Sequence, residues 1–414
     1  MTGASGPDAA RAPGASAAGP ADERARSKQR LVVVDAVRAL ALFGVLVMNL
    51  RDQSGTEYLS AEALAALQGP VDRALDVALE VLLDKKFLSA FSFLFGLSFT
   101  LLLARKDPYE ASFLLMYARR LIGLAAFGVA NVVFFYWADI LLTYAALGAL
   151  LLLFVRLPGW LVLACAALLT LGAPAVLAAL GATPGEEEQT AYELAALAAF
   201  SSPSWLQSMQ YGVERYLGYA GGSSSLYDTW DNLNIFGLFL LGLWVGRRQI
   251  PQALDRHRPL LRRVAAVALP LGLAASLAEV LLPETSPLAT LMLVGTPVLA
   301  VGYLAGAALL LERPAARPVA NVLAAPGRLA LTNYLAYGLI GQIAFYGWGL
   351  GWIGNADTAT VLAVALVGYG LMVLLSRLWL VPFTMGPAEW LWRCFTRFQV
   401  QPIRRRPEPA AAAA

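Results

Sequence analysis

The sequence has little charge and few of the side chains that soluble enzymes use most for chemistry. Charged residues make up 14% of its 414 residues, against roughly 25% in typical soluble domains. It has one histidine, His257, in a basic linker, and two cysteines, Cys165 and Cys394. This scarcity excludes a histidine-dependent triad or a zinc site within the apolar segments, and it excludes a disulfide framework. We therefore predict no metal site.

Apolar residues are abundant instead. They make up 58% of the chain, and the mean hydropathy is +0.62. A soluble fold of this size cannot bury so much apolar surface, so lipid must be the solvent for much of the chain. The net charge of +3 does not indicate a nucleic-acid partner, because the basic residues lie between apolar segments. The expected partners are a lipid bilayer and a small-molecule or lipid substrate.

Apolar runs close to the length of a bilayer-spanning helix, about 20 residues, recur along the chain. Basic residues gather in alternate linkers, as expected for the cytoplasmic side of a membrane. The predicted fold class is an all-α integral membrane bundle of about ten transmembrane helices in the cell membrane, with both termini cytoplasmic. The predicted spans are residues 31–50, 87–104, 121–137, 139–155, 159–180, 233–246, 264–282, 288–311, 329–346 and 358–381.

The predicted membrane domain covers residues 31–400. The flanking segments 1–30 and 401–414 are predicted to be disordered cytoplasmic tails, because they combine low complexity with charge and lack apolar periodicity. Residues 182–232 form a long external segment with acidic, aromatic and glycine-serine sequence. We expect this segment to be a loop that serves as a lid.

A second external segment, residues 71–84, is predicted to be an amphipathic helix. One face is apolar, and the other carries Asp72, Asp76, Glu80 and Asp84 at steps of four. Two interpretations are open. The carboxylates form the solvated face of a helix that lies on the membrane surface, or they form an outer vestibule for a hydroxyl-bearing or cationic substrate.

Ionisable residues inside a span need a partner or a function, because each costs on the order of 2.5–3.5 kcal/mol or more. Asp35 and Arg38 lie three residues apart near the cytoplasmic end of the first span. They form either a structural ion pair or a site for an anionic group from the cytosol. Asn49, at the other end, is predicted to be an interfacial cap or an interhelical hydrogen-bond donor.

The junction of the third and fourth spans, FFYWADILLTY (134–144), contains Asp139 and Tyr144. Asp139 opens a helix and is well suited to be its N-cap. A carboxylate there also suits a general base, in a pocket with aromatic walls that includes Tyr144 and Asn131. Both interpretations remain open.

Polar residues also mark the C-terminal region. The segment 326–351 contains Asn333 and Tyr334, and small and polar residues of this kind favour interhelical hydrogen bonds. The segment GPAEWLWR (386–393) places Glu389 and Arg393 four residues apart in an aromatic, amphipathic helix, which we expect on the cytoplasmic surface.

Several of these segments resemble the YeiB/DUF418 family of bacterial multi-pass membrane proteins. The resemblance rests on RLVVVDAVRALALFGVLVMN (30–49), KFLSAFSFLFGLSF (86–99), RRLIGLAAFGVANVVFFYWADILLTYAALG (119–148), and the C-terminal segments GRLALTNYLAYGLI and GPAEWLWR. It extends from about residue 30 to 400. The positions that match the family's motifs are Asp35, Arg38, Lys86, Arg119, Arg120, Asp139, Asn333, Glu389 and Arg393.

The resemblance implies a relationship to transmembrane acyltransferases, in which an acyl donor from the cytosol meets an acceptor on the other side of the membrane. It implies no permanently bound cofactor, and acyl-CoA or another acyl donor as co-substrate. The chain departs from the family pattern at Ala39, which replaces a glycine, and at Asn131, which replaces a histidine in many members. An amide cannot take up a proton at neutral pH.

Three functions are compatible with the sequence. The first is acyl transfer to a hydroxyl or amine at the outer face, with Asp139, Asn131 and Tyr144 as catalytic candidates. The second is transport of a lipophilic metabolite, and the third is a non-catalytic protein that has retained the fold.

Overall fold

The computed structural model describes residues 20–103, 108–180, 189–221, 226–283 and 286–405. In these ranges the regular structure is helical, apart from an isolated bridge between Phe383 and Arg404. The α-helices are α1 Pro20–Gln53, α2 Ala61–Leu67, α3 Pro70–Leu82, α4 Lys86–Leu103, α5 Ala111–Phe134, α6 Leu141–Phe154, α7 Gly159–Ala167, α8 Ala173–Ala179, α9 Gln189–Phe200, α10 Trp205–Gly221, α11 Leu226–Arg247, α12 Leu254–Leu281, α13 Pro287–Met292, α14 Gly295–Leu311, α15 Arg317–Arg328, α16 Ala330–Phe345, α17 Thr358–Trp379 and α18 Pro387–Arg397.

Short turns complete the helical connections. A π-helical turn, η2 (Leu168–Gly172), joins α7 to α8 within one continuous apolar segment. Three 3₁₀ turns lie elsewhere in the described chain: η1 Thr56–Tyr58, η3 Ile250–Ala253 and η4 Pro314–Ala316.

Seven helical segments of the described chain are long and apolar enough to cross a membrane, which makes this a helical, multi-pass membrane protein. They are Leu31–Tyr58, Pro70–Leu103, Ala111–Phe134, Gly159–Ala179, Ile250–Leu281, Pro287–Leu311 and Thr358–Trp379, and the shorter apolar helix is Leu141–Phe154. The remaining two predicted spans fall on α11 and α16, which are helical but are not among the seven. The count of ten and the cytoplasmic placement of the termini stay predictions.

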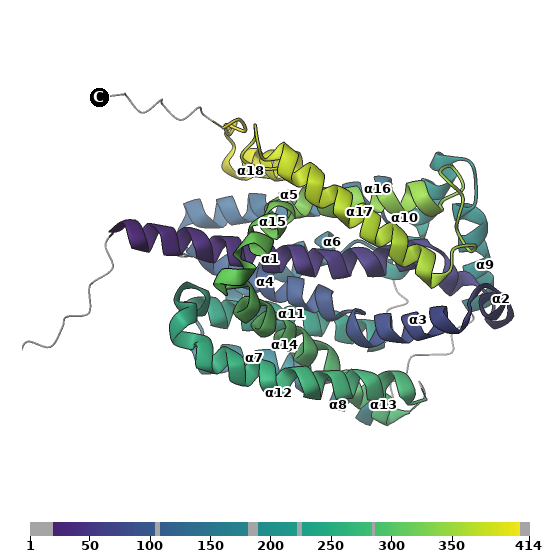
Figure 1. The fold of residues 1–414 in the computed structure, drawn as a ribbon, viewed down its shortest axis with the longest axis horizontal. Helices are drawn as coiled ribbons and strands as arrows, with labels where there is room; N and C mark the ends of the chain where they lie inside the picture. The colour runs from purple at the N-terminus through teal and green to yellow at the C-terminus, as the bar shows by residue number, and fades with distance from the viewer. Residues whose placement is uncertain (1–19, 104–107, 181–188, 222–225, 284–285, 406–414) are drawn as a thin grey trace, which may run out of the picture.

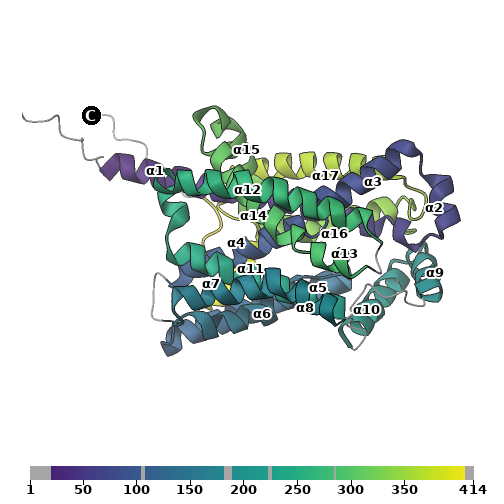
Figure 2. The same ribbon diagram turned by 90° about the horizontal axis from the view of Figure 1, so that it is seen from below.

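The long helices run roughly along the long axis of the molecule (Figures 1 and 2). The N-terminal part of α1 and α18 lie toward one end, and α2, α9 and α10 lie at the other. Large apolar side chains are exposed on the outward faces, including Leu271 and Leu277 of α12 and Leu371 and Leu375 of α17. Exposed apolar surface of this extent fits contact with lipid.

The centre of the bundle is held together by close helix contacts. Helix α4 packs along α11, and a Cβ atom added at Gly96 of α4 would lie 2.0 Å from the carbonyl oxygen of Phe239 on α11. Gly242 of α11 meets the carbonyl of Phe93 in the same way. Glycine is needed at both positions because any side chain would push the two backbones apart.

Two predicted segments differ from the structure. Helix α1 begins at Pro20, within the segment predicted to be a disordered tail, and residues 1–19 lie outside the described residues. The described part of 182–232 is not a loop, because α9, α10 and the start of α11 occupy it; residues 182–188 and 222–225 of the predicted lid lie outside the described chain.

The orientation of α3 also corrects an interpretation. The carboxylate row does not face bulk solvent: Asp72 is buried, and Asp72 and Asp76 bond to the start of α17 through Ala359 and Thr358. Part of the apolar face is exposed, with Val71 68% exposed, whereas Leu79 is buried. The helix therefore turns Asp72 and Asp76 into the protein, and the vestibule stays a prediction.

Candidate functional site

The bundle contains an outer chamber, a cavity of about 670 Å³ whose wall includes Thr56 and Glu57 of η1 and Leu64 of α2. Its described wall is strongly polar, with six acidic and three basic side chains. The acidic residues are Asp52, Glu57, Asp76, Glu80, Asp84 and Glu279, and the basic ones are Arg51, Lys85 and Lys86.

Each basic side chain of the outer chamber has a partner within the protein. Arg51 pairs with Asp76 at 3.4 Å and with Glu80 at 2.9 Å, and this joins α1 to α3. The Nζ of Lys86, which is buried, donates to the carbonyl of Glu80 at 2.9 Å. Lys85 pairs with Asp231 of α11 at 2.9 Å. Arg51 and Lys85 are thus paired with carboxylates, Lys86 is hydrogen-bonded to a carbonyl, and acidic side chains outnumber basic ones in the wall.

The bundle also contains an inner chamber, a cavity of about 310 Å³. Four arginines line it together with one carboxylate: Arg38, Arg120, Arg328, Arg393 and Glu389. Apolar and aromatic side chains form the rest of its wall, including Leu42, Phe91, Phe95, Leu124 and Trp392. The inner chamber is therefore basic and partly apolar, in contrast to the outer one.

The two chambers share a wall. Val45 of α1, Leu88 of α4, Ile140 before α6 and Tyr334 of α16 line both cavities. These residues are far apart in sequence, and the packing of four helical segments brings them together. We call them the shared wall.

Asp139 lies directly behind the shared wall. Its carboxylate accepts a 2.9 Å hydrogen bond from the Asn131 side chain and a 2.8 Å bond from the backbone N–H of Leu142. It thus fulfils the capping interpretation for the first turn of α6. Among the described residues that line either chamber are its neighbours Ala138 and Ile140, but not Asp139 itself.

Asp139 is buried, and its pKa reflects that. Burial raises the pKa of the carboxyl group to about 6, and hydrogen bonds from Leu142, Asn131, Leu141 and Tyr334 hold it from rising further. A carboxyl group with this pKa is largely ionised at neutral pH and still accepts a proton readily, which suits a general base.

Asp35 and Arg38 form the predicted pair, with 2.7 Å between Arg38 Nη1 and Asp35 Oδ1. Arg38 Nη1 also lies 3.4 Å from the carbonyl oxygen of Gly327 and lines the inner chamber. The pair is about one-fifth exposed, and the bond from Arg38 to Gly327 joins α1 to α15.

Glu389 joins α18 to the start of α16. Its Oε1 accepts from the backbone N–H groups of Leu331 and Thr332 at 2.7 and 3.1 Å, and its Oε2 accepts from Thr332 Oγ1 at 2.6 Å. These groups belong to the first turn of α16, so Glu389 caps that helix from another part of the chain. Burial raises the pKa of Glu389, and the bonds from Thr332 and Leu331 oppose that rise.

The other predicted site residues either line one of the chambers or make contacts that support its wall. Asn49 and Lys86 line the outer chamber, and Tyr144 lines the inner one with its hydroxyl 2.7 Å from Ser92 Oγ. The guanidinium group of Arg120 stacks on Trp392 at 3.9 Å in the inner chamber.

Arg119 and Asn333 contribute to neither of the two described walls. Arg119 stacks on Phe398 at 4.8 Å, and buried Asn333 donates to Pro326 and Ser376, which joins α16 to α15 and α17.

Sequence reasoning missed a cluster at the outer end of α1. Tyr136 donates a short hydrogen bond to Asp52, and Asp52 and Glu57 both line the outer chamber. Arg215 of α10 stacks between the rings of Tyr58 and Trp137, at 4.9 and 4.2 Å. The sequence signal was Asp52 at the end of a span, but its partners come from segments predicted to be separate. No group of three or more residues able to hold a metal occurs in the described chain.

Comparisons with known proteins show which family model and which proteins this chain resembles. A family model described as "Protein of unknown function (DUF418)" matches residues 245–399. The chain is similar to YxaH of Bacillus subtilis (strain 168), with 29% identity over 397 residues, covering 92% of this chain and 97% of YxaH. It is also similar to YeiB of Escherichia coli (strain K12), with 28% identity over 386 residues, covering 89% of this chain and 96% of YeiB. Both relatives are described as uncharacterized, and no solved structure matches. The family-model match and the similarity to YxaH and YeiB support the YeiB/DUF418 assignment that the sequence motifs indicate.

Proposed function

We propose that this membrane protein transfers an acyl group from a donor in the inner chamber to a hydroxyl or amine acceptor in the outer chamber. The observation that carries the proposal is the pair of chambers of opposite character with one shared wall. In this proposal the inner chamber faces the cytoplasm of the cell, both termini are cytoplasmic, and the chain crosses the cell membrane.

The inner chamber suits an anionic donor with an apolar acyl group. Arg38 and Arg393 offer guanidinium groups, which bind phosphate or carboxylate oxygens with paired hydrogen bonds. Leu42, Phe95 and Leu124 provide an apolar surface toward the shared wall. An acyl-CoA has both features, so we expect it or a similar acyl donor there.

The outer chamber suits a polar acceptor. Carboxylates such as Asp52, Glu57 and Asp84 accept hydrogen bonds from hydroxyl groups and from protonated amines. Asn49 adds an amide that both donates and accepts. An acceptor that presents its hydroxyl or amine to the shared wall would meet the acyl group there.

The chemical step needs a base close to the shared wall. The acceptor oxygen or nitrogen attacks the acyl carbonyl carbon, and a new C–O or C–N bond forms as the bond to the donor's sulfur breaks. Asp139 takes the proton of the acceptor and returns it to the leaving thiolate, so atoms and charge balance. Its pKa of about 6 suits both transfers. Asn131 keeps Asp139 in place and exchanges no proton.

Purified protein in lipid nanodiscs, incubated with radiolabelled acetyl-CoA and a panel of amine and hydroxyl acceptors, tests the proposal. We expect label on one acceptor class, and a rate lower by about 10²- to 10⁴-fold in Asp139→Asn. Asp357→Asn is the matched control, because Asp357 caps α17 through the N–H of Thr360 at 2.8 Å and lines neither described chamber. Equal rates in wild type and Asp139→Asn would contradict the role of Asp139.

Transport of a lipophilic metabolite is the second candidate, because two adjoining chambers also describe a path through a bundle. It predicts that a substrate crosses a proteoliposome membrane without chemical change. Acyl transfer instead predicts that the acceptor gains the acyl group and the donor loses it.

A further inference from the structure

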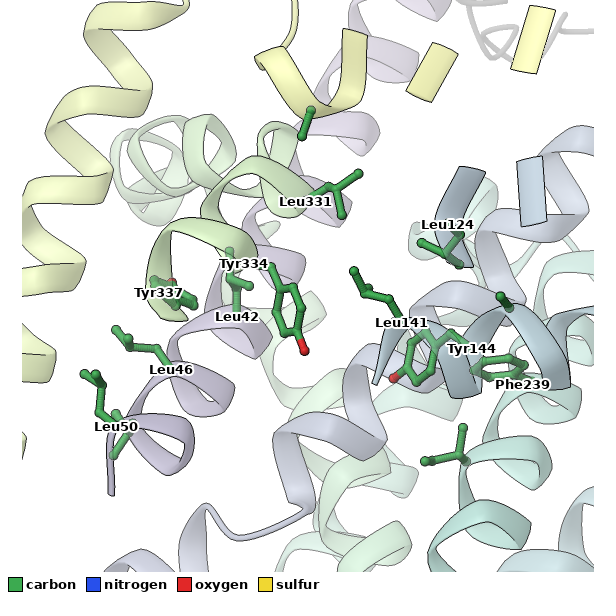
Figure 3. Packing of buried hydrophobic residues seen from close by; sticks show 14 of the residues in the cluster. Leu42, Leu46, Leu50, Leu124, Leu141, Tyr144, Phe239, Leu331, Tyr334 and Tyr337 are labelled. Carbon is green, nitrogen blue, oxygen red and sulfur yellow. The ribbon is translucent and has the colours of Figure 1, made fainter. Parts of the chain in front are cut away.

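Tyr334 differs from the other residues of the shared wall. Val45, Leu88 and Ile140 are aliphatic, so the hydroxyl of Tyr334 is the one polar side-chain group among the described residues that line both chambers. The residue is buried, and its ring points from α16 toward Leu141 and Tyr144 of α6 (Figure 3). A ligand that reaches the shared wall from either chamber would therefore meet this hydroxyl.

The hydroxyl of Tyr334 also reaches the segment that contains Asp139. The backbone N–H of Ile140, the residue after Asp139, donates to it at 3.4 Å, which places the hydroxyl beside the Asp139 carboxylate. Asp139 itself is absent from the described walls of both chambers. A proton that starts on a ligand in either chamber thus has Tyr334 between itself and Asp139.

We propose that Tyr334 relays the acceptor's proton to Asp139 and that its ring closes the passage between the two chambers. The relay rests on the proposed acyl transfer, whereas the closure does not. In the relay, the acceptor's proton moves to the Tyr334 oxygen as the phenolic proton moves to Asp139. Tyrosine therefore stays neutral throughout, and Asp139 gains the proton that the acceptor loses.

Tyr337 provides a matched control. It lies one turn later on α16, is fully buried, and lines neither described chamber. Figure 3 shows it beside α1 near Leu42 and Leu46, away from the side to which Tyr334 points. Its hydroxyl lacks a hydrogen-bond partner among the described residues, so removing it disturbs little.

Steady-state kinetics across pH test the relay. We expect Tyr334→Phe to lower kcat by about 10²-fold or more with little change in KM. The kcat of Tyr337→Phe should stay within about twofold of the wild-type value. The activity of wild type should rise as pH passes through about 6, where Asp139 ionises. The residual activity of Tyr334→Phe should lose this rise, which a merely structural role would not cause. An unchanged rate and pH profile in Tyr334→Phe would overturn the relay.

Accessibility of a thiol tests the closure without any enzymatic activity. Ser98 lines the inner chamber, so Ser98→Cys, in a chain with Cys165→Ser and Cys394→Ser, places one thiol behind the shared wall. A membrane-impermeant thiol reagent is applied to right-side-out and to inverted vesicles. We expect labelling from the inner-chamber side in every variant. From the outer side, we expect labelling in Tyr334→Ala only, and none in wild type, Tyr334→Phe or Tyr337→Phe.

Tyr334→Leu replaces Tyr334→Ala if the smaller side chain prevents folding, since it removes the ring and keeps apolar volume. The closure would be overturned if the wild-type protein were labelled from both sides. It would also be overturned if neither Tyr334→Ala nor Tyr334→Leu were labelled from the outer side. If no acyl transfer is found, the thiol result still decides the closure, whereas transfer that is insensitive to Tyr334→Phe overturns only the relay.

Discussion

The side-chain amide of Asn131 donates a 2.9 Å hydrogen bond to the carboxylate of Asp139, from the last turn of α5 to the start of α6. Both residues are buried behind the shared wall. The bond fixes one oxygen of Asp139, and the N–H of Leu142 fixes the other. Asn131, where the family resemblance leads us to expect a histidine, thus orients the carboxylate by donating a hydrogen bond.

Removal of that donor should change the pH dependence of activity. Asn131 lowers the pKa of Asp139, so Asn131→Leu should raise it above about 6 and shift the midpoint of the acid side of the rate profile to higher pH. Asn131→His keeps an N–H donor and should lie nearer to wild type. The measurement is kcat/KM against pH, and superimposable profiles for wild type and Asn131→Leu would contradict this assignment.

The free energy of unfolding should fall as Asp139 ionises with rising pH, whereas an ion-paired surface carboxylate stabilises the folded state when it ionises. Burial raises its pKa from 3.8 to about 6, so the folded state binds the proton more tightly than the unfolded state does. Stability is therefore lost as pH rises from about 4 to about 6, by up to about 1.4 kcal/mol per unit of pKa difference. Asp139→Asn should flatten this decline. Thermal midpoints in nanodiscs between pH 4 and 7 test it, and equal slopes for the two proteins would count against a buried, proton-binding Asp139.

Glu389 should stabilise α16 from outside that helix. Glu389→Ala removes the acceptors for the N–H groups of Leu331 and Thr332, and loss of a cap costs about 1–2 kcal/mol. Glu389→Gln keeps one acceptor oxygen and should cost less. Thermal unfolding followed by tryptophan fluorescence measures both. Because α16 carries Tyr334, we also expect Glu389→Ala to increase thiol labelling through the shared wall.

Arg51 should hold α3 against the bundle. Its two ion pairs are partly exposed, so their contribution to global stability is at most about 1 kcal/mol, but they are local to one helix. Arg51→Met should therefore increase hydrogen exchange in α3 with little change in the thermal midpoint. Arg73→Met, at an exposed arginine on α3 itself, is the control. Unchanged exchange in Arg51→Met would show that other contacts hold α3.

The sequence predicted the helices and the polar residues better than it predicted what they face. Amphipathicity of residues 71–84 shows that two faces of a helix differ, but not whether lipid or a polar cavity contacts each one. Asp76 and Glu80 turn inward because Arg51 and the start of α17 lie there, and these partners come from distant segments.

The shared wall could not be predicted from the sequence for the same reason. Val45, Leu88 and Ile140 are ordinary apolar residues of ordinary apolar segments, and only their convergence around Tyr334 gives them a role. The capping and base interpretations of Asp139 were both visible from its place before a helix. Packing adds that the carboxylate caps α6 and still lies beside the hydroxyl of Tyr334.

Acyl transfer across a sealed membrane tests the central claim most directly. Proteoliposomes with the inner chamber facing outward receive radiolabelled acetyl-CoA in the external medium and hold an acceptor, identified in the nanodisc assay, in the lumen. Two chambers that meet at a closed wall predict that label appears on the luminal acceptor, that intact donor stays outside, and that Asp139→Asn abolishes the signal. Intact donor in the lumen, or an acceptor that crosses the membrane without acquiring label, would contradict the account.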